Sequence, residues 1–576
     1  MLGSLVLAAA MSLNGSWEFR FEEGRSCLQV DAASFKATDS MTVPGCFDAM
    51  PKWFMKRGTG LYRRTFTIDK SVENAWLVID GLGLYGRFWV DGREIGTDDL
   101  PWSKVRLPIG ALSAGDHTVV AAVDNRYDWS YQKLARTYYD FHMWGGFFHG
   151  VSVDFDNRSL RIRTRDYRTG EVEIEAVEFA ADDFDAELLF DGKNAVKTQF
   201  RKGRATVKVP SFRLWSPDAP NLHTVSVKTS LNGVVEQSAA RFGIRTVETR
   251  NRGIYLNGNR IFIKGANRHE QHLPVGAATP EGVMLRDIQN LKAMGGNFFR
   301  GAHYPQSQRF LDLCDENGVM VWEESLGWGN GQRYTIQNGI NELKDQDFIR
   351  KQIEQTRLMV RNSFNHPSVI IFAFMNELDS AQEAAKALTD QLIETIRKED
   401  SGRLITFACN RIAEDICHEN TDIVAFNTYP GTINGYPGGH EELKDKIFNM
   451  KGHGIHWAAA HFRKKYPNKA IMVSEIGVAG TYGELDPSAP FRSEDFQDEH
   501  NRIVAEAVYS SEDIAGLAYW QFFDTRTTGR DCMNDGKKPY AMSHAGLFNW
   551  CRQPKRTVGE ITKWFRDAVP ANMKIQ

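Results

Sequence analysis

The stretch Val369-Ile-Ile-Phe-Ala-Phe-Met-Asn-Glu377 decides the fold of this chain. Seven apolar residues follow one another without a break and end in an amide and a carboxylic acid. A parallel strand covered on both faces has such an apolar run, and its polar end marks where it opens into a site. Ile471-Met-Val-Ser474 is followed by Glu475 in the same way. The two segments predict two buried strands, each with a carboxylate at its C-terminal end.

Six further segments of the C-terminal half resemble buried strands, and helical patterns lie between them. The spacing of three and four between Met284, Ile288 and Leu291 is typical of these helices. Strand-helix alternation over residues 248–576 predicts a (β/α)8 TIM barrel. The eight predicted strands are 261–264, 297–300, 319–323, 369–374, 404–407, 423–427, 471–474 and 517–520.

The barrel brings the two carboxylates to one face. Glu377 ends the fourth predicted strand and Glu475 the seventh, and the C-terminal ends of all barrel strands lie on the same side. Two carboxyl groups there are the minimum set for glycoside hydrolysis. Taken alone, each Glu is as readily explained as a solvated loop residue or an ion-pair partner. Taken together, they favour a catalytic pair.

The N-terminal part of the chain is all-β. Alternating runs such as Tyr62-Arg-Arg-Thr-Phe-Thr-Ile68, separated by turn signals such as Asp91-Gly92, predict a sandwich or jelly roll over residues 1–156. Residues 157–247 continue with alternating strands over about 90 residues, the size of an immunoglobulin-like sandwich. We therefore expect a multidomain chain of β and α/β parts.

Composition excludes several functions. With 70 basic and 73 acidic residues the chain has no polybasic field, so no nucleic-acid partner is expected. Its seven cysteines include no Cys-x-x-Cys pair, which indicates reduced thiols rather than a disulfide framework or a zinc site. No apolar run approaches the length of a membrane span, and no membrane partner is expected. The apolar residues 5–11 lack a preceding Lys or Arg, so a cytoplasmic and a periplasmic or secreted location both stay open.

Several motifs, in order along almost the whole chain, resemble glycoside hydrolase family 2, the β-galactosidase and β-glucuronidase family. They are Asn14-Gly-Ser-Trp17, Gly60-Leu-Tyr-Arg-Arg64, Lys264-Gly-Ala-Asn-Arg-His-Glu270, His303-Tyr-Pro305, Asn365-His-Pro-Ser-Val369, Asn376-Glu377 and Ser474-Glu-Ile-Gly477. The resemblance implies a jelly-roll sugar-binding domain, an immunoglobulin-like domain and a catalytic TIM barrel. It also implies retaining chemistry, with Glu377 as the acid/base and Glu475 as the nucleophile. Asn376 then fits a donor to the sugar 2-hydroxyl.

The resemblance assigns further residues to the sugar site. Arg300 is expected to steady Glu475 and to hold its pKa low by opposite charge. His269 and His303 match positions near the sugar ring, Asp140 is lent by the first domain, and Trp520 would form the floor under the terminal sugar. The full set of expected binding residues is Asp140, His269, Arg300, His303, Asn376, Asn427, Tyr429 and Trp520.

Departures from the family pattern bear on the substrate. Relatives that cleave glucuronides carry Asn-x-Lys before the last Gly-aliphatic-Phe, where this chain has Ser543, His544 and Ala545. A neutral β-galactoside is therefore the expected substrate, with a β-glucuronide or a β-galactofuranoside as alternatives. A cationic clamp can also come from the loop after strand eight, through Arg526, Arg530, Lys537 and Lys538.

Other expectations concern metals and partners. Gly327 and Gly329 stand where the large β-galactosidases place a magnesium-binding His, so no metal and no other cofactor are expected. The expected partner is a carbohydrate substrate, and a homo-oligomer is compatible with the sequence. The competing hypothesis is a carbohydrate-binding protein that kept the fold and lost activity; the presence of both Glu377 and Glu475 favours the enzyme.

Overall fold

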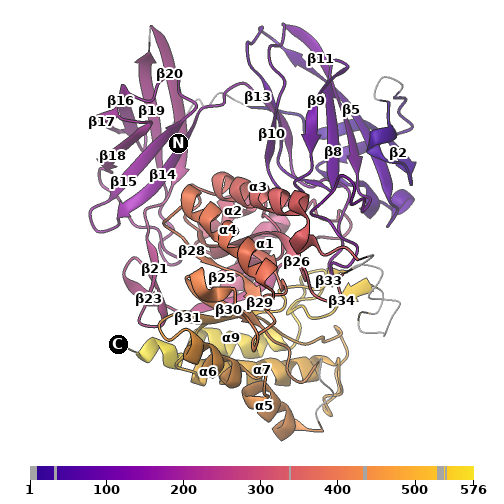
Figure 1. Ribbon diagram of the computed structural model, residues 1–576, viewed down its shortest axis with the longest axis vertical. Helices are drawn as coiled ribbons and strands as arrows, with labels where there is room; N and C mark the ends of the chain where they lie inside the picture. The colour runs from indigo at the N-terminus through magenta and orange to yellow at the C-terminus, as the bar shows by residue number, and fades with distance from the viewer. Residues whose placement is uncertain are drawn as a thin grey trace.

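A computed structural model describes residues 10–31, 35–231, 233–336, 339–432, 438–527, 538 and 541–575. Two β-sandwiches, in indigo and magenta in Figure 1, lie apart from one another on one side of a barrel coloured orange to yellow. The predicted fold class, strand-rich N-terminal domains followed by a TIM-like barrel, is confirmed. The division at residues 156 and 247 stays a prediction.

The first sandwich consists of antiparallel sheets. A six-stranded sheet has the order β3-β2-β5-β11-β8-β9, a four-stranded sheet the order β1-β13-β6-β10, and a small third sheet the order β4-β12-β7. The strands are β1 Met11–Ser12, β2 Gly15–Glu23, β3 Asp39–Val43, β4 Gly45–Cys46, β5 Gly58–Ile68, β6 Trp76–Ile79, β7 Leu82–Gly83, β8 Tyr85–Val90, β9 Arg93–Asp98, β10 Val105–Pro108, β11 Gly115–Asp124, β12 Gly146–Phe147 and β13 Val151–Asp154. Alternation turns Trp17, Phe19 and Tyr62 inward, where they pack with Phe88 and Phe147 in the core.

The second sandwich pairs a three-stranded sheet, β14-β15-β18, with a four-stranded sheet, β17-β16-β19-β20. Its strands are β14 Ser159–Asp166, β15 Glu171–Val177, β16 Phe184–Phe190, β17 Asn194–Phe200, β18 Arg204–Lys208, β19 His223–Leu231 and β20 Val234–Phe242. In β16 every second residue is buried, as expected for a strand with one face on a core. Phe184 and Phe200 stack across the paired strands β16 and β17, with ring centroids 4.6 Å apart.

The barrel is a closed ring of parallel strands. Its order is β28-β27-β26-β25-β24-β32-β31-β30-β29, and only Phe407 separates β28 from β29, so these two act as one interrupted strand. All eight predicted strands coincide with or overlap strands of this ring. Their bounds are β24 Ile263–Arg268, β25 Phe298–Gly301, β26 Met320–Trp328, β27 Val369–Asn376, β28 Leu404–Thr406, β29 Ala408–Cys409, β30 Ile423–Asn427, β31 Ala470–Ile476 and β32 Ile514–Tyr519.

Helices surround the ring (Figure 1). The described helices are α1 Glu281–Ala293, α2 Gln308–Asn317, α3 Gln346–Asn362, α4 Glu383–Glu399, α5 His440–Asn449, α6 Ile455–Lys465, α7 Glu494–Ser510 and α9 Thr557–Asp567. Helix α2 has sequence-encoded ends: the Ser307 side chain accepts from the Phe310 N–H, and Gly318 ends the helix at φ 68°.

The N-terminal end of the barrel is covered by a small sheet of β21 (Val247–Arg250), β22 (Gly253–Leu256) and β23 (Asn259–Ile261). Val247, Ile254 and Leu256 of this sheet share an apolar cluster with the barrel residues Ile263 and Met320. The opposite, C-terminal end is therefore the end that is open to a site.

The first sandwich packs against that open end. Trp102 stacks on Tyr304 of the barrel with ring centroids 4.3 Å apart, and His149 Nε2 lies 2.9 Å from Glu270 Oε2. The Trp129 indole donates to Asp345 Oδ2 at 3.1 Å. The Trp129 contact belongs to the long connection between β11 and β12, which carries Asp140, and ties this connection to the barrel. Near the mouth β33 (Thr525–Arg526) pairs with β34 (Met542–Ser543).

Two sequence expectations concern features outside the site. The six cysteines that the structure describes are free thiols, and Cys532 lies outside the described residues. Within the described chain, no helix is both long and apolar enough to cross a membrane. Of the apolar residues 5–11, only the last two are described.

Candidate active site

Glu377 and Glu475 both emerge at the C-terminal face of the barrel. Glu377 directly follows β27, and the chain leaves that strand in the left-handed region at Met375 (φ 44°) and Glu377 (φ 52°). Non-glycine residues rarely adopt this conformation, and it clusters at functional sites. Glu475 lies in β31, one residue before its end.

A cavity of about 850 Å³ opens at this face. Six residues of the predicted site line it: Asp140, Glu377, Asn427, Tyr429, Glu475 and Trp520. Other lining residues include Tyr138, Trp328, Tyr334, Asn410, His453, Phe491, Arg492, Lys538, Ser543, His544 and Ala545. The first sandwich, the barrel and the segment after strand eight therefore share one concave site.

Glu475 is held by a cation and a hydroxyl. Arg300 Nη1 donates to its Oε1 at 2.5 Å, and the Tyr429 hydroxyl donates to its Oε2 at 2.6 Å. Arg300 is fully buried, and it also forms an ion pair with Glu324 at 2.8 Å. His303 Nε2 lies 3.7 Å from Glu475 Oε1. Both oxygens of Glu475 thus accept hydrogen bonds that favour the ionised carboxylate.

Glu377 is held by amides instead. Asn427 Nδ2 donates to its Oε1 at 2.9 Å and Asn410 Nδ2 donates to its Oε2 at 3.0 Å. Gln332 supports this arrangement from behind, because its Nε2 lies 3.0 Å from Asn410 Oδ1. No cation contacts Glu377 directly among the described side chains. The hydrogen-bond partners of the Glu377 carboxyl group are thus neutral amides, which suits a protonated carboxyl group.

Asn376 is oriented by its carbonyl oxygen. Arg300 Nη2 and Asn427 Nδ2 both donate to Asn376 Oδ1, each at 3.0 Å. The Nδ2 of Asn376 is buried and has no hydrogen-bond partner among the described residues. Buried donors are normally paired, so this amide fits a partner that enters with a ligand.

The two carboxyl groups differ in proton affinity. Burial, and then the charge of Glu475, raises the pKa of Glu377 to about 8. Burial raises the pKa of Glu475 to about 7, against the lowering effect of Arg300 and Tyr429. The expectation that Arg300 holds this pKa low is wrong for the net shift, because desolvation outweighs the guanidinium. The sequence indicated the charge of Arg300 but not the burial of Glu475.

Asp140 meets Lys538 at the cavity. Their ion pair is 3.0 Å long and joins residues from opposite ends of the chain. Burial raises the pKa of Asp140, but Lys538, His303 and His269 together outweigh burial and leave this pKa below its usual range. Asp140 Oδ1 is buried without a hydrogen-bond partner among the described residues.

The other predicted residues lie behind the cavity wall. The His269 ring contacts the rings of His303 and Trp520 at 5.5 and 5.4 Å, and its Nδ1 lies 3.2 Å from the Tyr304 hydroxyl. His303 stacks on Trp520 at 5.3 Å. His269, Arg300, His303 and Asn376 are not among the residues that line the cavity. Arg300 in particular donates hydrogen bonds to Glu475, Glu324, Asn376 and Asn267.

Of the four cationic residues expected after strand eight, the structure describes Lys538 and Arg526. Lys538 lines the cavity, whereas the Arg526 guanidinium lies over the Phe54 ring at 4.8 Å and is not part of the lining. Arg530 and Lys537 lie outside the described residues.

Several site residues were not foreseen. Asn410 follows strand β29 and touches Glu377, so the rule that strand ends carry site residues would have found it. Glu324 sits in the middle of a strand, where no sequence signal separates a buried ion pair from an exposed face. Trp328, Tyr334 and Arg492 line the cavity from loops and loop borders.

Among the residues that the structure describes, two clusters have the residue types of metal sites. They are Cys409 with Asp415 and His418, and Asp312 with Asp315 and His366. Neither lines the cavity. In the first cluster, His418 Nδ1 lies 3.0 Å from Asp415 Oδ2, and the Arg411 N–H donates to Cys409 Sγ at 3.2 Å. Hydrogen bonds within the fold thus already use these groups.

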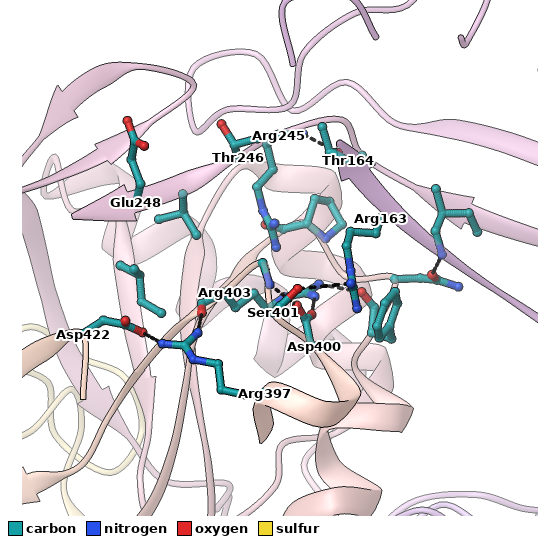
Figure 2. Close-up of a pocket in the computed structure, with 18 of the residues that line it drawn as sticks. Arg163, Thr164, Arg245, Thr246, Glu248, Arg397, Asp400, Ser401, Arg403 and Asp422 are labelled. Carbon is teal, nitrogen blue, oxygen red and sulfur yellow. Dashed lines mark hydrogen bonds and ion pairs between the residues drawn. The ribbon is translucent and has the colours of Figure 1, made fainter. Parts of the chain in front are cut away.

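A second cavity, of about 380 Å³, lies between the second sandwich and the barrel (Figure 2). Its arginines are held by the protein itself. Arg245 donates to the carbonyl oxygens of Pro367 and Val369 at 3.0 and 2.7 Å, and Arg403 pairs with Asp400. Arg397 pairs with Asp422 in the same region. Arg245 thus joins the end of the second sandwich to the barrel, whereas Arg403 and Arg397 pair within the barrel.

The first cavity, by contrast, has the equipment for acid/base and nucleophilic chemistry. One carboxyl group accepts from two amides, and the other accepts from a guanidinium and a hydroxyl. Beside them, the buried Asp140 Oδ1, Asn376 Nδ2 and His303 Nε2 have no hydrogen-bond partner among the described residues. A polyhydroxylated ligand would supply partners for all three.

Family models match most of the chain. A model described as "Glycosyl hydrolases family 2, TIM barrel domain" matches residues 247–565, which is more than half of the chain. A second, described as "Glycosyl hydrolases family 2", matches residues 151–245.

Known β-glucuronidases and a β-galacturonidase are similar to this chain in sequence or in fold. The chain is 28% identical over 407 residues to the β-glucuronidase of Sus scrofa, covering 68% of this chain and 58% of that protein. It spans about half the length of the curated relatives it matches. A β-galacturonidase of Eisenbergiella tayi bound to galacturonate superposes with a TM-score of 0.82 at 23% identity over 98% of each chain. A Ruminococcus gnavus β-glucuronidase in complex with uronic isofagomine gives 0.83 at 21% identity, over 97% of this chain and 98% of that one. These structures show a shared fold.

Proposed function

We propose that this chain, which belongs to glycoside hydrolase family 2, is a glycoside hydrolase that removes a terminal β-linked uronic acid with retention of configuration. The observation that carries the proposal is the pair Glu377 and Glu475, of different proton affinity, in one cavity with Lys538.

The contacts of each carboxyl group support its role. Glu377, with the higher pKa, protonates the glycosidic oxygen while ionised Glu475 attacks the anomeric carbon and forms a glycosyl-enzyme ester. Glu377, now ionised, then takes a proton from water, which attacks the same carbon and releases Glu475. Arg300 and Tyr429 stabilise the Glu475 carboxylate before attack and after release. Asn427 keeps Glu377 in place through both steps.

The unpartnered polar atoms support an exo site for one sugar ring. Asn376 Nδ2 is proposed to donate to the 2-hydroxyl, a contact that strengthens as positive charge develops on the ring. Asp140 Oδ1 accepts from a hydroxyl at the far end of the sugar, and Trp520 lies against an apolar ring face. Arg300 and His303 act behind Glu475.

The sugar class rests on charge. An ionised uronate that enters a cavity needs a cationic partner, because a buried unpaired charge costs several kcal/mol. Lys538 and Arg492 provide cations in the lining. The relatives named above act on or bind uronic acids by their names, which favours this reading over the neutral β-galactoside expected from the sequence.

A neutral β-galactoside is the second candidate. Ser543 and Ala545 line the cavity where the glucuronide-cleaving relatives place their clamp, and they carry no charge. Lys538 is already neutralised by Asp140 at 3.0 Å. A uronide would have to share Lys538 with Asp140, whereas a neutral sugar would leave the pair intact.

Nitrophenyl glycosides decide between the two. We expect kcat/KM for the β-glucuronide or β-galacturonide to exceed that for the β-galactoside and β-galactofuranoside by about a hundredfold, equivalent to about 2.7 kcal/mol. Lys538→Met should lower the uronide value by about 10- to 100-fold and the galactoside value by less, since a neutral sugar loses only the ion-pair partner of Asp140. Lys398→Met is the matched control, because Lys398 is exposed on α4. A preference of the wild-type enzyme for the galactoside would overturn the uronide assignment.

A further inference from the structure

Part of the cavity wall is aromatic and is not used by the chemistry described above. Tyr138, Trp328 and Tyr334 all line the cavity. Trp328 lies at the centre of this group, with ring centroids 6.5 Å from Tyr138 and 6.2 Å from Tyr334. Tyr334 is 54% exposed, so part of its surface is free to contact a ligand. We call these three residues the aromatic wall.

The aromatic wall lies on the Glu377 side of the cavity. Trp328 is the last residue of β26, which pairs with β27, and Trp328 is in register with Asn376. The following turn is bonded to the end of β27, because the Gly329 N–H donates to the Asn376 carbonyl at 2.8 Å. Gln332 Nε2 donates to the Glu377 carbonyl at 3.1 Å. Tyr334 follows two residues later and is therefore anchored to the strand that delivers Glu377.

This location matters because of what a general acid does. The acid protonates the oxygen between the sugar and the leaving group, so the leaving group must lie on the side of the acid. Phe491 and Arg492, which also line the cavity, belong instead to the segment between β31 and α7. The two sides of the cavity thus meet different parts of a substrate.

We propose that the aromatic wall is the leaving-group subsite, and that it selects substrates whose leaving group has a flat apolar face. This rests on the proposed role of Glu377 as the acid. An aromatic ring and the C–H face of a hexose share this chemistry, because both stack on aromatic side chains. A leaving group without such a face gains nothing from the wall.

The test compares leaving groups on the sugar that wild-type enzyme cleaves best. The leaving groups of a 2,4-dinitrophenyl glycoside and of a glycosyl fluoride both depart with little help from an acid. Only the dinitrophenyl leaving group has an aromatic ring. Tyr334→Ala should lower kcat/KM for the dinitrophenyl glycoside by about three- to tenfold and leave the fluoride unchanged. Tyr334→Phe keeps the ring and removes only the hydroxyl that bonds Asn410, so it should retain most of the wild-type value for the dinitrophenyl glycoside. Tyr482→Ala is the control, because Tyr482 is 45% exposed and does not line the cavity.

The remaining outcomes separate the possible failures. An equal fall for the fluoride, or a shift in the alkaline limb of the pH profile, would mean that Tyr334 only positions Glu377. No change for either substrate would remove Tyr334 from the subsite. Measuring kcat/KM of the same variants on a disaccharide shows whether a hexose leaving group, like an aryl group, is bound by the aromatic wall. If wild-type enzyme cleaves no glycoside of the panel, the proposed function itself has failed before any variant is compared.

Discussion

Replacing Tyr429 by Phe removes one hydrogen bond from Glu475 and little else. The Tyr429 hydroxyl donates to Glu475 Oε2 at 2.6 Å, and it is the contact of Oε2 that favours the ionised form. The ring stays in the cavity wall, so the shape of the site is preserved. The variant therefore isolates the electrostatic contribution of this hydroxyl.

The size of the effect follows from the geometry. A hydrogen bond to a charged group contributes about 1.5 to 3 kcal/mol, and about 1.36 kcal/mol corresponds to one pKa unit. The pKa of Glu475, about 7 in the intact protein, should rise by about one to two units. A raised pKa keeps the nucleophile protonated to higher pH, so the loss is largest in acid and shrinks as pH rises through the new pKa.

The assay is kcat/KM as a function of pH on the preferred nitrophenyl glycoside. The wild type should give a bell with limbs near the pKa values of Glu475 and Glu377, about 7 and about 8. Tyr429→Phe should move the acid limb upward and lower kcat/KM at pH 6 by about 10- to 100-fold. Tyr138→Phe is the control, since the Tyr138 hydroxyl has no hydrogen-bond partner among the described residues. An acid limb that stays in place would refute the role given to Tyr429.

Three further predictions follow from the same site. Asp140→Asn should lower kcat/KM by about a hundredfold with an unchanged melting temperature, because Asp140 Oδ1 is expected to bind the sugar; an active variant would reduce Asp140 to a loop residue. Glu377→Ala should lose turnover, and azide should restore cleavage of dinitrophenyl glycosides as a β-glycosyl azide; an α-azide product would contradict retention. EDTA should leave kcat/KM unchanged, because the two metal-type clusters of the described residues lie away from the cavity; a loss that magnesium reverses would show a catalytic metal.

The fold was readable from the sequence where local pattern determines it. Continuous apolar runs such as that of β27 identified the barrel strands, and their polar ends identified Glu377 and Glu475. Strand β26 shows the limit of this reasoning. It was predicted to end at Glu323 but continues to Trp328, because Glu324 is buried in an ion pair with Arg300 that no local pattern reveals.

The site was less readable, because it depends on contacts between distant parts of the chain. The Asp140–Lys538 ion pair joins two segments far apart in sequence. Its strength determines how strongly Lys538 could bind the carboxylate of a uronic acid. His269 follows a barrel strand, as a rim residue should, yet its ring packs behind Trp520. The pKa of Glu475 depends on burial that only the packed structure shows.

Covalent labelling tests the central assignment most directly. A 2-fluoro glycoside of the preferred sugar slows both steps, and a good leaving group lets the first step proceed, so the glycosyl-enzyme ester accumulates. Peptide mass spectrometry of the inactivated protein should place the label on Glu475, and Glu475→Gln should fold and remain unlabelled. A label on Glu377 or on any other carboxylate would contradict the account.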